Sequence, residues 1–211
     1  MIIESIKRSE NKPDKFITLF EDGTEISVNA VQIADFGLYT GRELSDGEFS
    51  QLCEELKLSS AKARAIRILG SRDLSVREVE RRLVDKGESR EIAQKTVQWL
   101  ESIGAVDDGK YAVAIAKHYY SKGFGKARIR DELYRRGIER DMWEDAICDA
   151  LSDTDSIEEA VNGFLEKKLK GSCDAMDLRR ATDALCRRGF SYEEARTAVS
   201  QYLDSIEEDL K

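Results

Sequence analysis

Apolar residues recur at intervals of three and four along residues 61–206, and this periodicity predicts helices. The clearest helix begins at Ser75, which has the spacing of a capping box with Glu78 and is followed by an i, i+4 apolar pair, Val79 and Leu83. The region contains no proline and is rich in helix-forming residues, so we expect no strand in it.

A short phrase that begins with leucine and ends with glycine occurs three times, at residues 83–87, 133–137 and 185–189. Its glycines are Gly87, Gly137 and Gly189 and lie 50 and 52 positions apart, so the repeating unit has the size of a small helical module. A glycine just past the last helical turn can adopt the left-handed conformation that satisfies the final carbonyls. We therefore expect each phrase to end a helix.

Each unit is predicted to contain three helices. A leading helix is expected near residues 61–69, 111–120 and 157–169, and a second helix ends at each phrase. A third helix follows the glycine, with Ser89 and Ser191 as capping residues in the first and last units.

The first sixty residues have a different pattern. Residues 16–20 and 25–28 are β-prone and flank an Asp-Gly turn, which predicts a hairpin, and isoleucines among the first six residues can add a strand. Because an isolated hairpin is marginally stable, we expect it to pack on residues 31–38 or on the first repeat. A helix near residues 46–56 would connect the two parts.

These patterns predict a mostly α protein: a tandem array of three three-helix repeats, elongated and curved, with a small N-terminal β-hairpin extension. The expected extension covers residues 1–60, and the expected repeats cover residues 61–109, 110–152 and 153–211. With 211 residues, 41% hydrophobic and 36% charged, the chain suits several small cores better than one large core.

Charge is distributed unevenly. The chain has a net charge of −8, yet residues 61–140 carry 19 basic and 12 acidic side chains, whereas residues 1–60 carry 6 and 12 and residues 141–211 carry 9 and 18. A polyanion or an acidic protein groove could dock on the basic middle; the alternative is a solvated face balanced by neighbouring carboxylates. The candidate partner-binding residues are Arg77, Arg81, Arg82, Lys126, Arg128, Arg130, Arg135 and Arg136.

Residues 103–112, Ile-Gly-Ala-Val-Asp-Asp-Gly-Lys-Tyr-Ala, resemble the most recognisable signature of the RecX family of recombinase regulators. Residues 75–87 resemble the family's first-repeat motif, and residues 125–138 resemble its second. The resemblance covers roughly residues 61–210, and in the third repeat it retains Leu185, the Arg-Gly pair at 188–189 and helical periodicity. The N-terminal hairpin resembles an extension seen in part of the family.

The resemblance implies a non-enzymatic regulator, mostly an inhibitor, of the RecA recombinase. The chain's scattered cysteines and the lack of a signal-like apolar run predict a cytoplasmic protein. Such a regulator binds the groove of the RecA filament on single-stranded DNA and suppresses ATPase, strand exchange and coprotease activity in recombination, DNA repair and the SOS response. The basic residues would contact either acidic protomer surfaces or DNA phosphates, and the sequence leaves both open. The alternative is a direct DNA-binding protein with tandem helix-turn-helix-like modules, which is disfavoured because the helix after each glycine is mostly acidic or neutral.

No residue pattern predicts catalysis, a cofactor or a metal site. The Asp107-Asp108 pair favours a helix cap over metal binding, with Tyr111 packed at the repeat junction. His118 is the only histidine, which argues against a His-based triad or zinc site. Residues 122–126 lack the spacing of a phosphate loop and predict a turn.

Three further expectations concern the whole chain. Four cysteines without a Cys-x-x-Cys pair indicate reduced thiols, and the longest apolar runs fall short of a membrane span. We expect a monomer. Two tyrosines, Tyr119 and Tyr120, are candidates for stacking on a nucleic-acid base if they are exposed.

Overall fold

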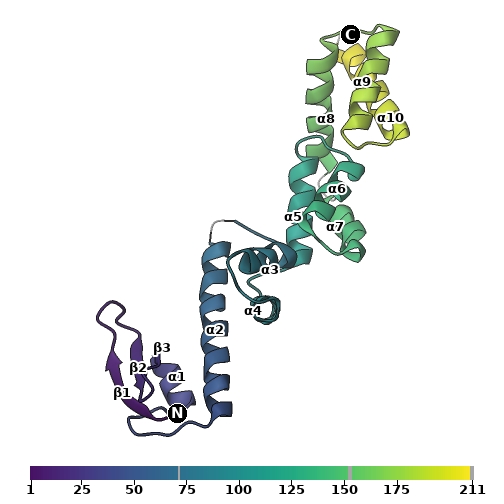
Figure 1. Cartoon of the computed structure of the whole chain (residues 1–211). Helices are drawn as coiled ribbons and strands as arrows, with labels where there is room; N and C mark the ends of the chain where they lie inside the picture. Colours follow the sequence, from purple (N-terminus) through teal and green to yellow (C-terminus); the bar gives the residue numbers. More distant parts are fainter. Residues whose placement is uncertain (71, 152–153, 210–211) are drawn as a thin grey trace.

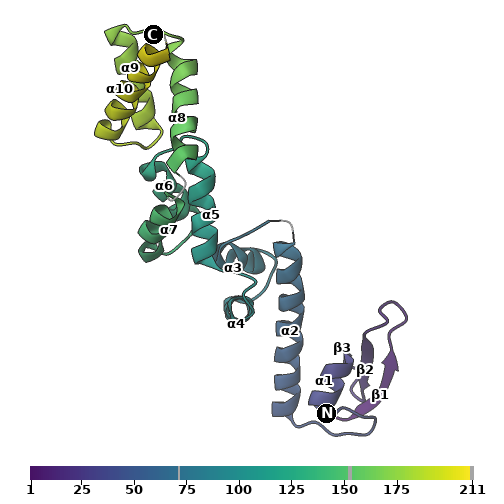
Figure 2. The same ribbon diagram turned by 180° about the vertical axis from the view of Figure 1, so that it is seen from behind.

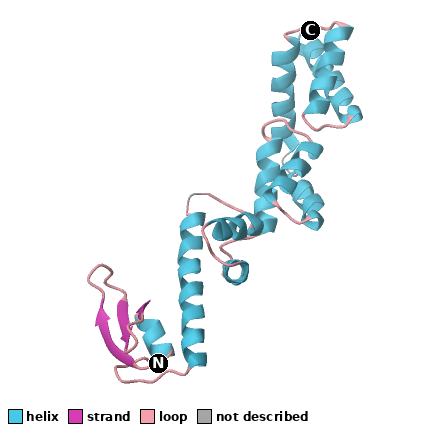
Figure 3. Ribbon diagram, viewed as in Figure 1, coloured by secondary structure: helices cyan, strands magenta, loops and turns pink. Residues whose placement is uncertain are grey.

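The computed structural model describes residues 1–70, 72–151 and 154–209, with side chains described outside residues 154–156 and 207–209. The molecule is an elongated, stepped array with a small sheet at its N-terminal end and helical groups in succession towards its C-terminal end (Figures 1 and 2). Helices dominate, and the described strands are confined to the N-terminal module (Figure 3). The predicted fold class is confirmed.

The N-terminal module is a three-stranded antiparallel sheet in the order β1-β2-β3 with a short helix beside it. Its elements are β1 (Ile3–Arg8), β2 (Phe16–Phe20), β3 (Glu25–Val28) and α1 (Ala30–Asp35). The predicted hairpin and the additional strand are both confirmed. The sheet buries Phe20 against Leu38, so it packs on the segment that follows it, and also against Leu52 of the next helix.

The helix α2 (Asp46–Leu69) connects this module to the first repeat. The expectation of two separate helices, near residues 46–56 and 61–69, is wrong: one helix runs through both. The intervening Lys-Leu-Ser-Ser segment contains neither glycine nor proline, so nothing in it stops the helix. Leu52 packs on the sheet while Ala65 is buried in the first repeat, so the two ends of α2 belong to different cores.

The remaining helices fall into groups that succeed one another along the array (Figure 1). Repeat 1 comprises α2, α3 (Val76–Asp85) and α4 (Arg90–Ser102). Repeat 2 comprises α5 (Asp108–Tyr120), α6 (Lys126–Arg136), a 3-10 turn (Arg140–Met142) and α7 (Trp143–Ala150). Repeat 3 comprises α8 (Thr154–Leu169), α9 (Ala175–Arg187) and α10 (Tyr192–Asp209).

The repeated phrase has the same structural role in each group. Its leucines, Leu83, Leu133 and Leu185, are all fully buried, each in the core of its own repeat. Its glycines have φ angles of 92°, 75° and 95° in chain order, which is the left-handed conformation predicted for a helix end. The phrase therefore anchors the middle helix of a repeat and then terminates it.

Candidate partner-binding groove and the joints between repeats

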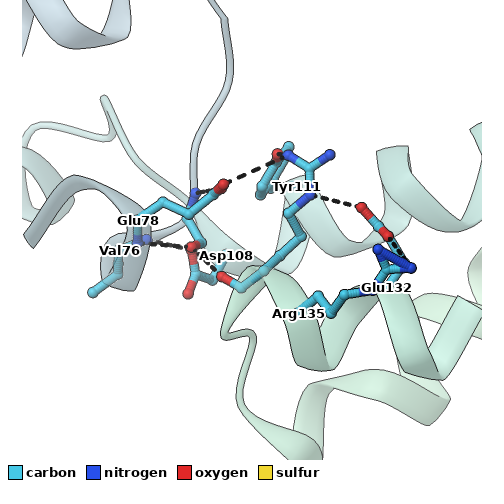
Figure 4. A network of polar contacts seen from close by, with 8 residues as sticks. Val76, Glu78, Asp108, Tyr111, Glu132 and Arg135 are labelled. Carbon is cyan, nitrogen blue, oxygen red and sulfur yellow. Dashed lines mark hydrogen bonds and ion pairs between the residues drawn. The ribbon is translucent and has the colours of Figure 1, made fainter. Parts of the chain in front are cut away.

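The joint between repeats 1 and 2 forms at the N-terminus of α3 (Figure 4). Ser75, the N-cap of α3, donates its hydroxyl to the carbonyl of Arg136 at the end of α6, with an O–O distance of 2.5 Å. The Val76 amide donates to the Asp108 carboxylate at the start of α5, at 2.9 Å. Two helices of repeat 2 thus supply acceptors for one helix terminus of repeat 1.

The Arg136 side chain lies within this joint. Its Nη1 donates to the hydroxyl of Tyr111 at 2.6 Å and its Nε donates to Glu132 at 2.8 Å, while Glu78 of repeat 1 lies 3.7 Å away. Burial acts to raise the pKa of the Glu132 carboxyl, but hydrogen bonds from Arg136 and Tyr119 and the nearby arginine charges outweigh it, so the pKa is lowered. Arg136 therefore links the repeats through its own side chain.

The joint between repeats 2 and 3 uses the equivalent carbonyl as acceptor, with backbone donors in place of the Ser75 hydroxyl. The Gly125 amide, at the N-cap of α6, donates to the Arg188 carbonyl at 2.9 Å, and the Ala127 amide donates to the Gly189 carbonyl at 3.1 Å. The approach requires glycine, because a Cβ at position 125 would lie 2.4 Å from the carbonyl carbon of Gly189. The arginine of the repeated phrase thus meets the N-cap of the preceding repeat's middle helix at both joints.

The Arg188 side chain has a less acidic setting than Arg136. Its Nη1 donates to the carbonyls of Lys122 and Gly123 at 2.9 and 3.2 Å. Its guanidinium lies over two aromatic rings, 4.0 Å from the centroid of Phe164 and 5.0 Å from that of Phe124. Residues 122–125 form the predicted turn and Lys126 begins α6, while the Phe124 ring lies against Arg188 in this joint.

The Asp107-Asp108 pair divides between two structural roles. Asp107 is the N-cap of α5 and accepts a hydrogen bond from the Lys110 amide at 3.0 Å, which confirms the predicted cap. Asp108 contacts repeat 1 instead, and its burial raises its pKa despite the Val76 hydrogen bond. Among the described residues, no group of three or more histidine, cysteine or acidic side chains is placed to hold a metal ion.

A groove of about 240 Å³ lies beside the first joint, between α3 and α6. We call it the junction groove; it is lined by Arg77, Glu78, Arg81, Tyr134, Arg135, Arg136 and Gly137. Arg77 and Arg81 are exposed and form no ion pair with any described residue, and Arg135, also exposed, lies 3.6 Å from Glu132. Tyr134 is 72% exposed. The groove therefore presents cationic side chains around an exposed aromatic ring.

The structure does not bring all eight predicted basic residues together. Arg77, Arg81, Arg135 and Arg136 meet at the junction groove, although Arg136 is largely engaged in the joint. Arg82 is half-buried on α3. Lys126, Arg128 and Arg130 lie on the first half of α6, towards the second joint, and Arg130 forms a two-point ion pair with Glu144 at 2.9 and 3.0 Å.

The aromatic residue of the groove was not among the sequence candidates. Tyr120 is only 3% exposed and Tyr119 is half-buried, so the exposure that base stacking requires is lacking at Tyr120, and the accessible ring is Tyr134. The available signal was its position inside the repeated phrase, where the other two repeats have Val84 and Cys186. Tyr134 therefore gives α6 an exposed aromatic ring at the position where α3 and α9 have a small apolar side chain.

Comparison with known proteins decides the family. Residues 61–100 match the family model of the first RecX three-helix domain, and residues 107–147 match that of the second. The "Regulatory protein RecX" of Xanthomonas campestris pv. campestris (strain B100) is 32% identical over 138 residues, which cover 64% of this chain and 83% of that protein. The chain belongs to the RecX family. The RecX match spans both joint-forming helices of the junction groove, α3 and α6.

Other RecX relatives match nearly the whole chain. "Regulatory protein RecX" of Clostridioides difficile (strain 630) is 24% identical over 214 residues, covering 99% of each chain, and that of Bacillus subtilis (strain 168) is 28% identical over 211 residues, covering 98% of this chain and 79% of the relative.

Solved RecX structures share the fold. One crystal structure of regulatory protein RecX aligns with a TM-score of 0.76 at 17% identity and covers 96% of this chain and 98% of the other. RecX from Lactobacillus salivarius aligns with a TM-score of 0.62 at 21% identity, over 69% and 96% of the two chains. Within residues 1–70, 72–151 and 154–209, none of the helices combines the length and apolar character needed to cross a membrane.

Proposed function

We propose that this RecX-family protein is a non-enzymatic, cytoplasmic regulator of RecA that binds the RecA filament on single-stranded DNA. In this proposal it acts mainly as an inhibitor and suppresses ATP hydrolysis, strand exchange and coprotease activity. The observation that carries the proposal is the junction groove, because it is formed by the two three-helix domains that match the RecX family.

The charge of the groove supports a polyanionic or acidic partner. Arg77, Arg81 and Arg135 are exposed there, in the segment of the chain whose net charge is +7. A cationic groove raises the local concentration of an anionic partner and speeds association, and salt weakens both effects. Acidic protomer surfaces and DNA phosphates are both available to it in a nucleoprotein filament.

The shape of the molecule supports a filament as the partner. Repeats that dock only on their neighbours create an extended surface, and such a surface can span adjacent subunits of a helical polymer. In this protein each joint is built on the carbonyl of the arginine in the repeated phrase, and these contacts link one repeat to the next. A single monomer could therefore contact several protomers and block extension of the filament.

The deciding experiment measures DNA-dependent ATP hydrolysis by RecA from the same host, titrated with this protein well below the RecA concentration. We expect suppression at this sparse occupancy, because simple coverage of bare DNA requires far more protein. The variant Arg77→Glu, Arg81→Glu, Arg135→Glu should lose most of the suppression. A matched control with the same change in charge, Arg179→Glu, Arg187→Glu, Arg196→Glu, should retain it; all three control residues are exposed on repeat 3.

Circular dichroism should show both variants folded, because exposed substitutions usually change stability by about 0.5 kcal/mol or less. Equal suppression by the groove variant and the parent would show that the junction groove is not the contact surface. Absence of suppression even at equal concentrations would refute regulation of RecA itself.

Direct DNA binding by tandem helix-turn-helix-like modules is the second candidate. The exposed Tyr134 between cationic side chains favours it, because basic grooves with stacking platforms bind single strands. Titration of labelled single-stranded and duplex DNA at several salt concentrations separates the two. Tight binding to DNA alone, with a steep loss on adding salt and no effect on RecA, would favour this candidate.

A further inference from the structure

A second cavity lies at the other joint, between repeats 2 and 3, and is larger than the junction groove. It has a volume of about 480 Å³, which is within the range of ligand-binding clefts. Its apolar lining comes from both repeats: Leu151, Ile157, Val161, Phe190 and Ala198. We call it the acidic cleft, for the charges described below. The elements around it are α5, α6, α8 and α10, which meet where the third group joins the second (Figure 1).

The cleft contains an unsatisfied buried hydrogen-bond donor. Tyr120 lines it and is 3% exposed, and its hydroxyl has no hydrogen-bond partner among the described residues. Burial raises the pKa of Tyr120 to about 12, so the phenol is neutral and able to donate. A buried hydroxyl without a partner is unfavourable, and an incoming acceptor would satisfy it.

The charges around the cleft are predominantly acidic. Glu158 and Glu194 line it from α8 and α10, and both are exposed; the basic lining residue is Lys126, which is half-buried. The chain from residue 141 to residue 211 has 9 basic and 18 acidic side chains, a net charge of −9. The basic groups near the cleft, Lys126 and Arg130, both come from α6, so a cationic partner is favoured on the side of the cleft that α8 and α10 form.

We propose that the acidic cleft binds an apolar side chain carried by a basic peptide segment of a partner protein. The anchor side chain occupies the apolar lining and displaces the side chains that cover the Tyr120 hydroxyl, which then donates a hydrogen bond to a main-chain carbonyl of the segment. Flanking lysine or arginine side chains face Glu158 and Glu194. This inference rests on the proposed function in that a protein filament supplies such a segment. It gives the two joints opposite specificities, one for anionic and one for cationic surfaces.

The experiment uses the full chain and three labelled peptides whose binding is followed by fluorescence anisotropy. The probe is Lys-Lys-Leu-Phe-Lys-Lys, and its controls are Glu-Glu-Leu-Phe-Glu-Glu and Lys-Lys-Gly-Gly-Lys-Lys. We expect the probe to bind at least tenfold more tightly than either control. Equal binding of the glycine peptide would overturn the inference, because it would show charge attraction without an apolar anchor.

Three variants locate the binding. Ala198→Trp should fill the cleft and weaken probe binding at least tenfold, and Glu158→Lys should weaken it severalfold by reversing a charge that makes no ion pair within the described chain. Tyr120→Phe removes only the donor, so it should fold at least as well as the parent while binding the probe a few-fold more weakly. The last two variants keep the test valid if the tryptophan variant does not fold.

The outcomes distinguish this inference from the proposed function. Unchanged probe binding in all folded variants overturns the acidic cleft, whatever the effect on RecA. Probe binding that depends on the cleft, in a protein that leaves RecA unaffected, supports the cleft and refutes regulation of RecA. If both hold, Ala198→Trp and Glu158→Lys should also weaken suppression of RecA ATP hydrolysis.

Discussion

The two joints of this molecule share a backbone acceptor and differ in almost everything around it. At both, the carbonyl of the phrase arginine accepts a hydrogen bond from the N-cap residue of the preceding repeat's middle helix. The first joint surrounds its arginine with carboxylates and a phenol, whereas the second places Arg188 over two aromatic rings. The common contact orders the repeats, and the differing side chains determine which surface opens beside each joint.

This difference explains why the surfaces have opposite charge. In the first joint Glu132 is almost fully buried against Arg136 and contributes little to the surface. The exposed side chains of Arg77, Arg81 and Arg135 therefore give the junction groove its positive charge. In the second joint the arginine is held by carbonyls and rings, and the carboxylates Glu158 and Glu194 remain exposed. A tandem repeat can thus keep one docking geometry and present two kinds of surface.

The largest expected effect comes from a cavity in the core of repeat 2, the repeat that takes part in both joints. Leu133 is fully buried in repeat 2, and Leu133→Ala should lower the free energy of unfolding by about 2 to 5 kcal/mol through loss of burial and a residual cavity. Urea denaturation followed by circular dichroism measures it. The adjacent exposed residue provides the control: Tyr134→Ala should change stability by about 0.5 kcal/mol or less. A similar loss in both variants would contradict the assigned packing.

A substitution at Gly125 should break the second joint and spare the first. A Cβ there meets the backbone of Gly189, so Gly125→Ala should cost about 1 to 3 kcal/mol and shift repeat 3 relative to repeat 2. Thermal unfolding and small-angle X-ray scattering measure the two consequences. The control Gly163→Ala lies in α8 with open space around it and should stabilise the helix by about 0.5 to 1 kcal/mol. Unchanged scattering in Gly125→Ala would show that this approach does not set the joint.

The two phrase arginines should differ in their contribution to stability. Arg136→Met leaves the buried Glu132 without its main partner and should cost about 1 to 3 kcal/mol. Arg188→Met keeps an apolar chain against Phe164 but loses the cation–π contacts and the hydrogen bonds to the carbonyls of Lys122 and Gly123. Because these acceptors are neutral and no carboxylate is left unpaired, we expect a smaller cost of about 0.5 to 1.5 kcal/mol. Urea denaturation of both variants, each compared with the parent, tests the order. The reverse order would mean that the aromatic joint is the stronger one.

Sequence alone predicted the elements better than the surfaces. The period of the apolar positions and the phrase glycines located the repeats because each repeat buries its own core, so its pattern is local. The continuity of α2 was missed because its two ends serve different cores, which weakens a single periodic signal. The sequence gives no reason to separate one basic residue from another. The contacts between repeats separate them, because Arg136 pairs with Glu132 in the first joint whereas Arg77 stays exposed. No local pattern contains that information.

The smallest expected effect is a pH dependence with opposite signs at two carboxyls of the first joint. Burial raises the pKa of Asp108, so the folded state binds its proton more tightly than the unfolded state, and this contribution to stability grows as pH falls through the range above the ordinary value of 3.8. The pKa of Glu132 is lowered, so its contribution is complete above the ordinary value of 4.5 and is lost as pH falls. The two contributions therefore oppose each other in the parent protein.

Separate neutralisation should reveal them. Asp108→Asn keeps an oxygen that can accept the Val76 amide, and it should lose more stability than the parent between pH 7 and pH 4. Glu132→Gln should lose less than the parent over the same interval. We expect the Asp108→Asn difference to be about 0.5 kcal/mol or less, measured by urea denaturation at each pH. Parallel pH profiles for both variants and the parent would show that neither carboxyl is coupled to folding, and the joint would then owe its stability to neutral contacts alone.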